Sequence, residues 1–231
     1  MKLHLLSDGF FTLDKSFLVY MKYMGQPYQA ALKPLLIQTP NDNILVDTGI
    51  GELPEKYRKY YSITRKPEQN LKVQLAHHGL RPQDISIVVN THLHFDHCGN
   101  NALFQDAKII VQASEYNYAL HPERFQETAY IRELLEIKAD YQLVQGEFKI
   151  SDEIRLVPTP GHSIGHQSVI IEGDKRNIYC GDAAPLRENL ERRNIPGVLY
   201  CSHQALESID RLKAIDNAVH VYSHDNEQLE L

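Results

Sequence analysis

Residues 91–100 read Thr91-His92-Leu93-His94-Phe95-Asp96-His97-Cys98-Gly99-Asn100. Three imidazoles and one carboxylate therefore lie within six positions, directly after an apolar run. Imidazole nitrogens and carboxylate oxygens suit zinc and its first-row neighbours, and catalytic zinc sites keep one coordination position open for water. The alternative, a solvated polar loop, is disfavoured because histidine is uncommon and three of them lie beside one aspartate. The pattern His-x-His-x-Asp-His thus predicts a metal site.

The residues before the motif predict how it is presented. Asp84–Asn90 reads as a buried strand, because four of its seven residues are aliphatic and Arg-Pro-Gln at 81–83 marks its start. In an extended chain, His92 and His94 then point to the same side and converge on one ion. Asp96 and His97 are expected in a turn that opens a loop or helix, where they face a second ion.

One short motif cannot complete two coordination shells, so further ligands are expected downstream at similar strand ends. Three segments deliver His or Asp after a strand-like run, where glycine or proline opens a loop. They are residues 158–162 (Pro-Thr-Pro-Gly-His), residues 177–182 (Asn-Ile-Tyr-Cys-Gly-Asp) and residues 219–225 (Val-His-Val-Tyr-Ser-His-Asp).

With these segments in place, the chain resembles the metallo-β-lactamase superfamily over nearly its whole length. The resemblance implies an α/β fold, a four-layer αββα sandwich with two sheets face to face, helices outside and the site at one edge. It also implies the metal ligands, and all seven positions are filled in the right order. They are His92, His94 and His162 for the first metal, Asp96, His97 and His224 for the second, and Asp182 as the bridge between them.

The expected cofactor is a pair of divalent ions, with Zn²⁺ favoured and Mn, Fe or Co accepted by the same ligands. Two close ions lower the pKa of a shared water, so a metal-bridging hydroxide is expected to attack the substrate near neutral pH. Asp96 or Asp182 is expected to pass the proton to the leaving group, which makes them the candidate catalytic residues.

Several segments resemble the N-acyl homoserine lactonases in particular: residues 91–101, 160–168, 223–228 and the N-terminal run 9–14. The resemblance implies a quorum-quenching hydrolase that opens a lactone ring. One position departs from it, because those lactonases usually carry a tyrosine three residues after the bridging aspartate and this chain has Pro185. Tyr20, Tyr23 and Tyr222 are candidates to replace that hydroxyl, and a structural role is the alternative for each.

Two other functions compete with the lactonase prediction. A thioester or phosphoester hydrolase would use the same metal site, although the glyoxalase type needs a C-terminal domain that this chain is expected to be too short to hold. A non-catalytic metal-binding or sensor domain is the alternative from another class. The complete set of seven ligands argues against it.

Composition sets further bounds. With 231 residues, 42% hydrophobic and 23% charged, the chain is expected to form a single domain over residues 1–231. Its 24 Lys and Arg against 30 Asp and Glu give a net charge of −6, which offers no electrostatic reason to bind nucleic acid. No run approaches the roughly 20 apolar residues of a membrane span, and residues 1–9 are too polar for a signal peptide.

Three cysteines form no disulfide framework, and Cys98 is expected to be a buried thiol rather than a ligand. Together with the missing signal peptide, this composition predicts a soluble cytoplasmic protein with a small-molecule ester or lactone substrate. The apolar segment 17–24 is interpreted as an ordinary buried strand, with an acyl-binding pocket or a homodimer contact as alternatives.

The remaining pattern predicts a hairpin of strands 35–39 and 43–47, and helices at 67–78, 114–121, 123–139 and 203–214, the last with Ser202 as N-cap. His77 and His78 are expected at a helix C-terminus capped by Gly79. Asp47 either orients a ligand histidine or forms a local turn, and His166 either supports the site or makes a strand-edge hydrogen bond.

Overall fold

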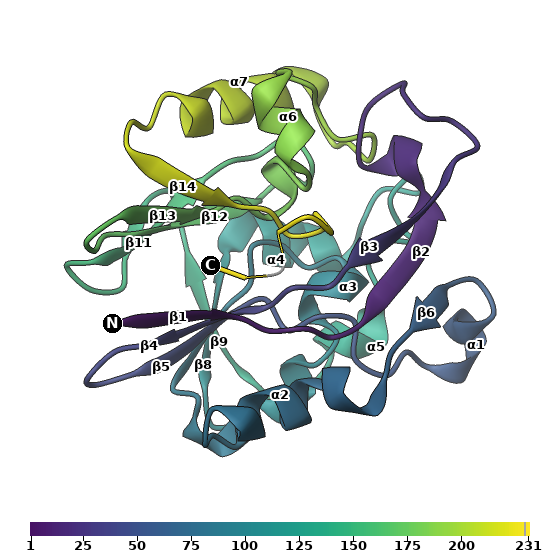
Figure 1. Ribbon diagram of the computed structural model, residues 1–231. Helices are drawn as coiled ribbons and strands as arrows, with labels where there is room; N and C mark the ends of the chain where they lie inside the picture. Colours follow the sequence, from purple (N-terminus) through teal and green to yellow (C-terminus); the bar gives the residue numbers. More distant parts are fainter. Residues whose placement is uncertain (229) are drawn as a thin grey trace.

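The computed structural model describes residues 1–228 and 230–231, and its centre is two β-sheets packed face to face. The first sheet has the order β1-β4-β5-β7-β8-β9 and the second the order β10-β11-β12-β13-β14. Helices cover the outer faces, with α2 below the first sheet and α6 and α7 above the second (Figure 1). This is the expected four-layer αββα sandwich.

The strands of the first sheet are β1 (Lys2–Leu5), β4 (Leu35–Gln38), β5 (Asn43–Val46), β7 (Ile87–Val89), β8 (Lys108–Gln112) and β9 (Asp140–Val144). Those of the second are β10 (Phe148–Lys149), β11 (Ile154–Pro158), β12 (Gln167–Ile171), β13 (Arg176–Tyr179) and β14 (Ala218–Val221). A smaller sheet has the order β3-β2-β6, from β3 (Pro27–Ala31), β2 (Phe10–Asp14) and β6 (Ser62–Thr64).

The α-helices are α1 (Glu55–Arg58), α2 (Leu71–His77), α3 (Phe95–Cys98), α4 (Ala113–Leu120), α5 (Arg132–Leu135), α6 (Arg187–Glu191) and α7 (Ser202–Lys213). In the part of the chain that the structure describes, no helix has both the length and the apolar character needed to cross a membrane.

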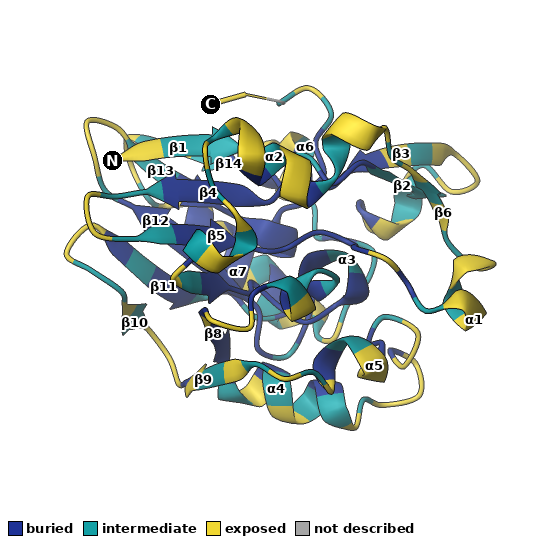
Figure 2. Ribbon diagram, turned by 90° about the horizontal axis from the view of Figure 1, so that it is seen from below, coloured by how far each residue is buried: buried dark blue, intermediate teal, exposed yellow. Residues whose placement is uncertain are grey.

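Alternation along the strands divides the core into layers. Leu35 and Ile37 of β4 face the second sheet, whereas Leu36 between them packs with Leu71 and Leu75 of α2. Such alternation follows from the two-residue period of a strand, which sends successive side chains to opposite faces. Figure 2 shows the result, with the central strands buried and the outer faces of the helices exposed. Each sheet is therefore covered on both sides.

Strand direction brings the chemically active segments to one edge. Strands β5, β7, β8 and β9 run parallel to one another, and β13 and β14 are also parallel. The carboxyl ends of neighbouring parallel strands meet at the same edge of a sheet, where α/β proteins bind their ligands. The motif after β7, residue 182 after β13 and residue 224 after β14 therefore lie together.

The predicted hairpin is confirmed, since β4 and β5 pair antiparallel. The helices predicted at 67–78, 114–121 and 203–214 correspond to α2, α4 and α7, and α2 ends at His77 with Gly79 at φ 72°, as expected of a C-cap. The N-cap prediction was wrong by one residue, because Cys201 occupies the N-cap position of α7, without a side-chain capping hydrogen bond, and Ser202 is the first helical residue.

The helix predicted at 123–139 is wrong for most of its length. Residues 124–129 form consecutive turns and only Arg132–Leu135 is α-helical. Tertiary contacts explain the difference, because Phe95 donates its N–H to the carbonyl of Ala129 and both Tyr130 and Ile131 are buried. Adjacent residues buried in two different clusters require an extended backbone there, which overrides the helical propensity.

Two strand predictions also need correction. Residues 17–24 are not a strand, because a 3₁₀ turn at Lys15–Phe17 leads into further turns with left-handed backbone at Met21 and Tyr23. The strand predicted at 84–90 is confined to Ile87–Val89, since Pro82–Asp84 forms a 3₁₀ turn.

Candidate metal centre

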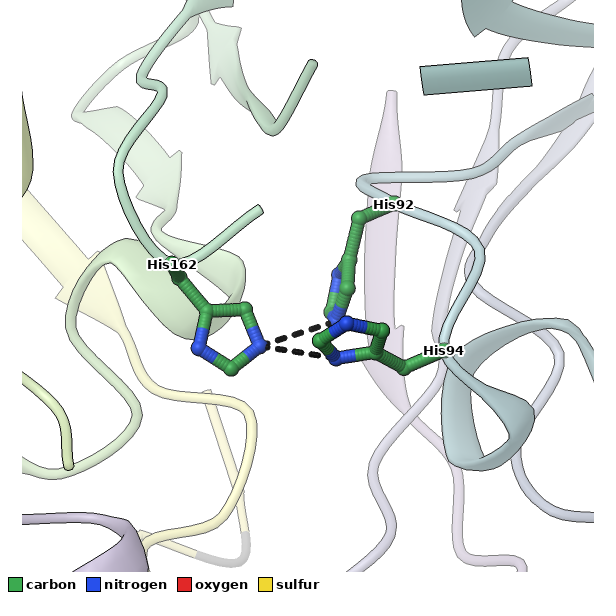
Figure 3. Close-up of side chains that lie close together, drawn as sticks. All are labelled: His92, His94 and His162. Carbon is green, nitrogen blue, oxygen red and sulfur yellow. Dashed lines mark hydrogen bonds between the residues drawn. The ribbon is translucent and has the colours of Figure 1, made fainter. Parts of the chain in front are cut away.

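The first cluster consists of three buried histidines, His92, His94 and His162 (Figure 3). The Nε2 atom of His162 lies 3.2 Å from His92 Nε2 and 3.0 Å from His94 Nδ1. The ring of His162 comes from the loop between β11 and β12 and faces the two rings that follow β7. Three imidazole nitrogens that converge in this way form a ligand set suited to zinc or a neighbouring metal.

The second cluster contains Asp96, His97 and His224. Asp96 and His97 are consecutive residues of the single-turn helix α3, as the sequence predicted for a turn next to Gly99. The Nε2 atom of His224 lies 3.6 Å from Asp96 Oδ2, and that of His97 lies 3.8 Å from the same oxygen. Two nitrogens and one oxygen therefore face a common point.

The Asp182 carboxylate lies between the two clusters. Its Oδ2 atom is 3.4 Å from His162 Nε2, while Oδ1 is 3.3 Å from His224 Nε2 and 3.4 Å from His97 Nε2. Ser223 donates a hydrogen bond of 2.6 Å to Oδ1 and fixes its orientation. One carboxylate that faces a ligand of each cluster is what a bridging ligand requires.

Hydrogen bonds at the far side of the rings leave the facing nitrogens free. His162 Nδ1 donates to the carbonyl of Val198 (2.9 Å) and His224 Nδ1 to that of Ala31 (2.8 Å), because a carbonyl can only accept. His97 Nδ1 lies 2.8 Å from the Asp47 carboxylate. In the neutral form of each ring, Nε2 then keeps its lone pair, as metal binding requires. Among residues 1–228 and 230–231, the buried His97 Nε2 has no hydrogen-bond partner, so the residues present fit a bound cation.

The charges of the cluster agree with this fit. Burial lowers the pKa of His92 and His94 well below the ordinary value, and the neighbouring imidazoles lower it further. Burial also opposes charge on His97, but the carboxylates of Asp182 and Asp96 outweigh it and raise its pKa well above the ordinary value. For Asp182 itself, burial raises the pKa, and the imidazoles of His224 and His97 bring it well below the usual range. The centre thus combines neutral imidazoles at His92 and His94 with an ionised Asp182 carboxylate and with a His97 imidazole whose protonated form is favoured.

Asp47 orients His97 rather than only forming a turn. It follows β5 with a left-handed φ of 57°, a conformation that costs free energy for a residue with a side chain. Its carboxylate accepts hydrogen bonds from the Thr91 backbone N–H (2.7 Å) and the Thr91 hydroxyl (2.8 Å) and contacts His97. One strained residue therefore connects both ends of the motif.

His166 and Cys98 lie near the centre, but their side chains form hydrogen bonds to groups outside the two clusters of ligands. The Nε2 atom of His166 accepts the backbone N–H of Asp182 at 2.9 Å, and its Nδ1 lies 2.9 Å from the Thr159 hydroxyl. His166 thus holds the backbone of Asp182 in place. The buried Cys98 thiol donates to the carbonyl of Leu93, as predicted for a buried thiol.

Two glycines allow the ligand loops to approach other backbone closely. A Cβ atom on Gly99 would lie 2.1 Å from the carbonyl oxygen of Ile50, and one on Gly161 would lie 2.1 Å from the amide nitrogen of Ala205. Gly161 also has φ 131°, which L side chains rarely adopt. A side chain at either position would push a ligand loop away from the centre.

Glu115 joins the two loops that carry His92, His94 and His162, and sequence reasoning missed it. This fully buried carboxylate of α4 accepts four hydrogen bonds, from Leu93 N–H (3.0 Å), Tyr130 O–H (3.0 Å), Ser163 O–H (2.8 Å) and Gly165 N–H (2.9 Å). Burial raises its pKa, and these hydrogen bonds oppose that shift. The only signal in the sequence was an acidic residue in a helix with many apolar neighbours, which does not reveal its partners.

We expect Glu115→Gln to weaken binding of the ion at the three-histidine cluster about 10- to 100-fold. All four partners are donors, so the new amide NH₂ would face a donor instead of an acceptor. Chelator competition with Zn²⁺ or Co²⁺ measures the two affinities, and Glu123→Gln on the exposed loop is the matched control. Equal affinities in wild type and Glu115→Gln would show that the carboxylate does not position these loops.

A cavity of about 290 Å³ opens beside the centre. Its floor includes His94, Asp96, His162, Asp182 and His224, and its walls are mainly apolar, from Phe11, Leu13, Phe17, Leu18, Phe95 and Phe125. Part of the segment 17–24 therefore lines a pocket, whereas Tyr20, Met21 and Met24 are exposed. A concave apolar site with a few converging polar groups is the usual form of a small-molecule site.

The three tyrosines proposed to replace the missing hydroxyl do not line this cavity within the described residues. Tyr20 is exposed, Tyr23 donates its hydroxyl to Glu188 at 2.9 Å, and Tyr222 is buried against α7 and its neighbours. The backbone of Pro185 instead accepts the N–H of His224 at 3.0 Å. That contact gives position 185 a structural role beside the centre.

Comparison with known proteins agrees with this geometry. The family model of the metallo-beta-lactamase superfamily matches residues 34–224. An N-acyl homoserine lactonase of Bacillus cereus is 30% identical over 98% of this chain and 94% of its own length.

Solved structures give the same result. An N-acyl homoserine lactone hydrolase with the product N-hexanoyl-L-homoserine at its catalytic metal centre superposes with a TM-score of 0.88, at 30% identity over 98% of this chain and 94% of the other. A dizinc quorum-quenching lactonase superposes with a TM-score of 0.74 over 99% of this chain and 88% of the other, and at 19% identity it supports the fold alone.

Proposed function

The chain belongs to the metallo-beta-lactamase superfamily, and we propose that it is a dinuclear metal-dependent hydrolase that opens the ring of N-acyl homoserine lactones. The observation that carries this proposal is the Asp182 carboxylate, which lies within 3.4 Å of imidazole nitrogens of both clusters at the floor of an apolar cavity. The B. cereus lactonase covers almost the same length, and a related hydrolase holds the ring-opened product at its metal centre.

The residues divide between two ions. His92, His94 and His162 would hold one, Asp96, His97 and His224 the other, and Asp182 would bridge them. Zinc is the proposed metal, because five imidazoles and two carboxylates suit it. Bound there, two divalent ions supply a water of lowered pKa and polarise the lactone carbonyl.

The remaining chemistry belongs to the protein. Ring opening adds one water across the ester bond, and a proton must move from that water to the departing ring oxygen. Asp96 and Asp182 both line the cavity. Asp96 is the better placed to move the proton, because its side chain is 12% exposed against 7% for Asp182, both of whose oxygens face imidazoles. The apolar walls exclude water and leave room for an acyl chain.

The test is hydrolysis of a small panel of esters by the metal-loaded protein, with proton release as the readout. We expect N-acyl homoserine lactones to be opened fastest, simple γ- and δ-lactones more slowly, and a lactoyl thioester and an aryl phosphodiester much more slowly. Turnover of the thioester or phosphodiester without any lactone would keep the metal site and overturn the substrate. Tight metal binding without turnover of any ester would favour a sensor.

A further inference from the structure

Gln126 is the buried polar residue of the cavity wall that the metal centre does not use. It lines the same cavity as His94, Asp96 and His162, and its exposed fraction is 2%. Within the described part of the chain, neither its Oε1 nor its Nε2 has a hydrogen-bond partner. A buried amide without partners destabilises the protein, so its presence calls for a ligand or another role.

Other fully buried amide side chains are hydrogen-bonded, whereas Asn194 Nδ2 and Gln204 Oε1, on partly exposed residues, also lack a partner within the described part of the chain. Gln112 Nε2 donates to the carbonyl of Gly146 and to Gln167 Oε1, both at 2.8 Å. Asn101 and Asn90 bond each other at 2.8 Å, and Asn189 Nδ2 donates to two backbone carbonyls. Gln126 differs from these side chains because the residue lines a cavity and neither its donor nor its acceptor has a partner.

The backbone holds Gln126 in a fixed place relative to the centre. Its N–H donates to the Glu123 carbonyl at 2.9 Å, and its own carbonyl accepts the N–H of Ala129 at 2.9 Å. Ala129 then accepts the N–H of Phe95, one residue before Asp96, at 3.0 Å. This turn was predicted as part of a long helix, and its actual conformation is what brings Gln126 to the cavity.

No tyrosine hydroxyl of the described residues competes for this role at the cavity wall. Tyr61 lines the cavity, but its hydroxyl donates to the carbonyl of Thr128 at 2.8 Å. Tyr130 stacks edge-on against His94 and donates its hydroxyl to Glu115. Pro185 has no side-chain donor at all. Besides the expected ion ligands, the polar side chains that line the cavity are then Thr128, which is exposed, and Gln126, which is buried and has no other partner.

We infer that Gln126 recognises the acyl amide of the substrate, an inference that rests on the proposed lactonase function. A glutamine side chain offers one acceptor oxygen and an NH₂ donor, which together complement the N–H and C=O of a secondary amide. Both amide atoms are buried, so the side chain would turn toward the cavity on binding, and contact with the substrate would then satisfy its unpaired groups. The residue would thus select lactones that carry an acylamino group over lactones with a plain alkyl chain.

Gln126→Met tests this role, because methionine keeps the length of the side chain and removes both hydrogen-bonding groups. We expect kcat/KM for N-hexanoyl homoserine lactone to fall about 10- to 100-fold. We expect kcat/KM for an α-alkyl-γ-butyrolactone of equal chain length, which lacks the amide, to stay the same or rise. The matched control is Gln105→Met, at an exposed glutamine outside the cavity. We expect this variant to keep the wild-type kcat/KM for both lactones.

The wild-type protein provides a test that does not depend on the folding of a variant. It is expected to open the amide-bearing lactone at least tenfold more efficiently than the amide-free lactone. Equal efficiency on the two lactones, or an equal loss on both in Gln126→Met, would overturn amide recognition while the lactonase function stands. A wild-type protein with both metals that opens neither lactone would overturn the proposed function and this inference with it.

Discussion

Asp182→Asn is expected to lower kcat/KM for N-hexanoyl homoserine lactone about 100- to 1000-fold. The carboxylate faces His162 on one side and His97 and His224 on the other, at 3.3 to 3.4 Å. An amide of the same shape would carry no charge, and its NH₂ group would point at one set of nitrogens. We therefore expect binding of the second ion to weaken as well.

Steady-state kinetics and metal content, measured on the same sample, check this prediction. Asp174→Asn is the control, because Asp174 is an exposed carboxylate in the turn between β12 and β13. An Asp182→Asn protein that kept two metals and full activity would contradict the bridging role. Loss of activity with both metals retained would instead place the role of Asp182 in the chemical step.

Removal of the metals is expected to abolish lactone opening and to lower the melting temperature by about 10 °C. Ions at a thousandfold excess over their dissociation constant stabilise the folded state by about 4 kcal/mol, and about 1 kcal/mol corresponds to 2–4 °C in a domain of this size. The apo centre also keeps a buried His97 nitrogen without a partner among residues 1–228 and 230–231.

Calorimetry before and after treatment with a chelator measures the stability change, and added Zn²⁺ should restore both stability and activity. The control is the variant His224→Ala, in which one ligand set is already incomplete. In this variant, the chelator should lower the melting temperature by less than in the wild type. An unchanged melting temperature in the wild type would mean that no tightly bound ion contributes to its stability.

The central architecture could be predicted from sequence because it depends on local patterns. The motif has two histidines at a spacing of two after a buried run, and then Asp and His before Gly99. Its geometry therefore depends only on residues that are close together in the sequence. The distant partners His162, Asp182 and His224 followed from the family resemblance and from their positions at strand ends. Each of these residues needs only a strand and a turn to place it.

What the sequence did not reveal depends on contacts between distant segments. Glu115 is one acidic residue in a helix, and its four donors come from residues 93, 130, 163 and 165. The residues before Tyr130 form turns in place of the predicted helix, because the carbonyl of Ala129 accepts the backbone N–H of Phe95. The position of Gln126 at the cavity could not be predicted for the same reason, because it depends on those turns.

The most direct measurement is a titration of the metal-free protein with Zn²⁺. The rate at which N-hexanoyl homoserine lactone is opened is measured at each step from proton release. The seven-residue centre predicts no activity in the apo protein and a rate that rises until two ions are bound per chain. Activity that saturates at one ion per chain would contradict the dinuclear centre. Absence of ring opening at two bound ions would contradict the lactonase function itself.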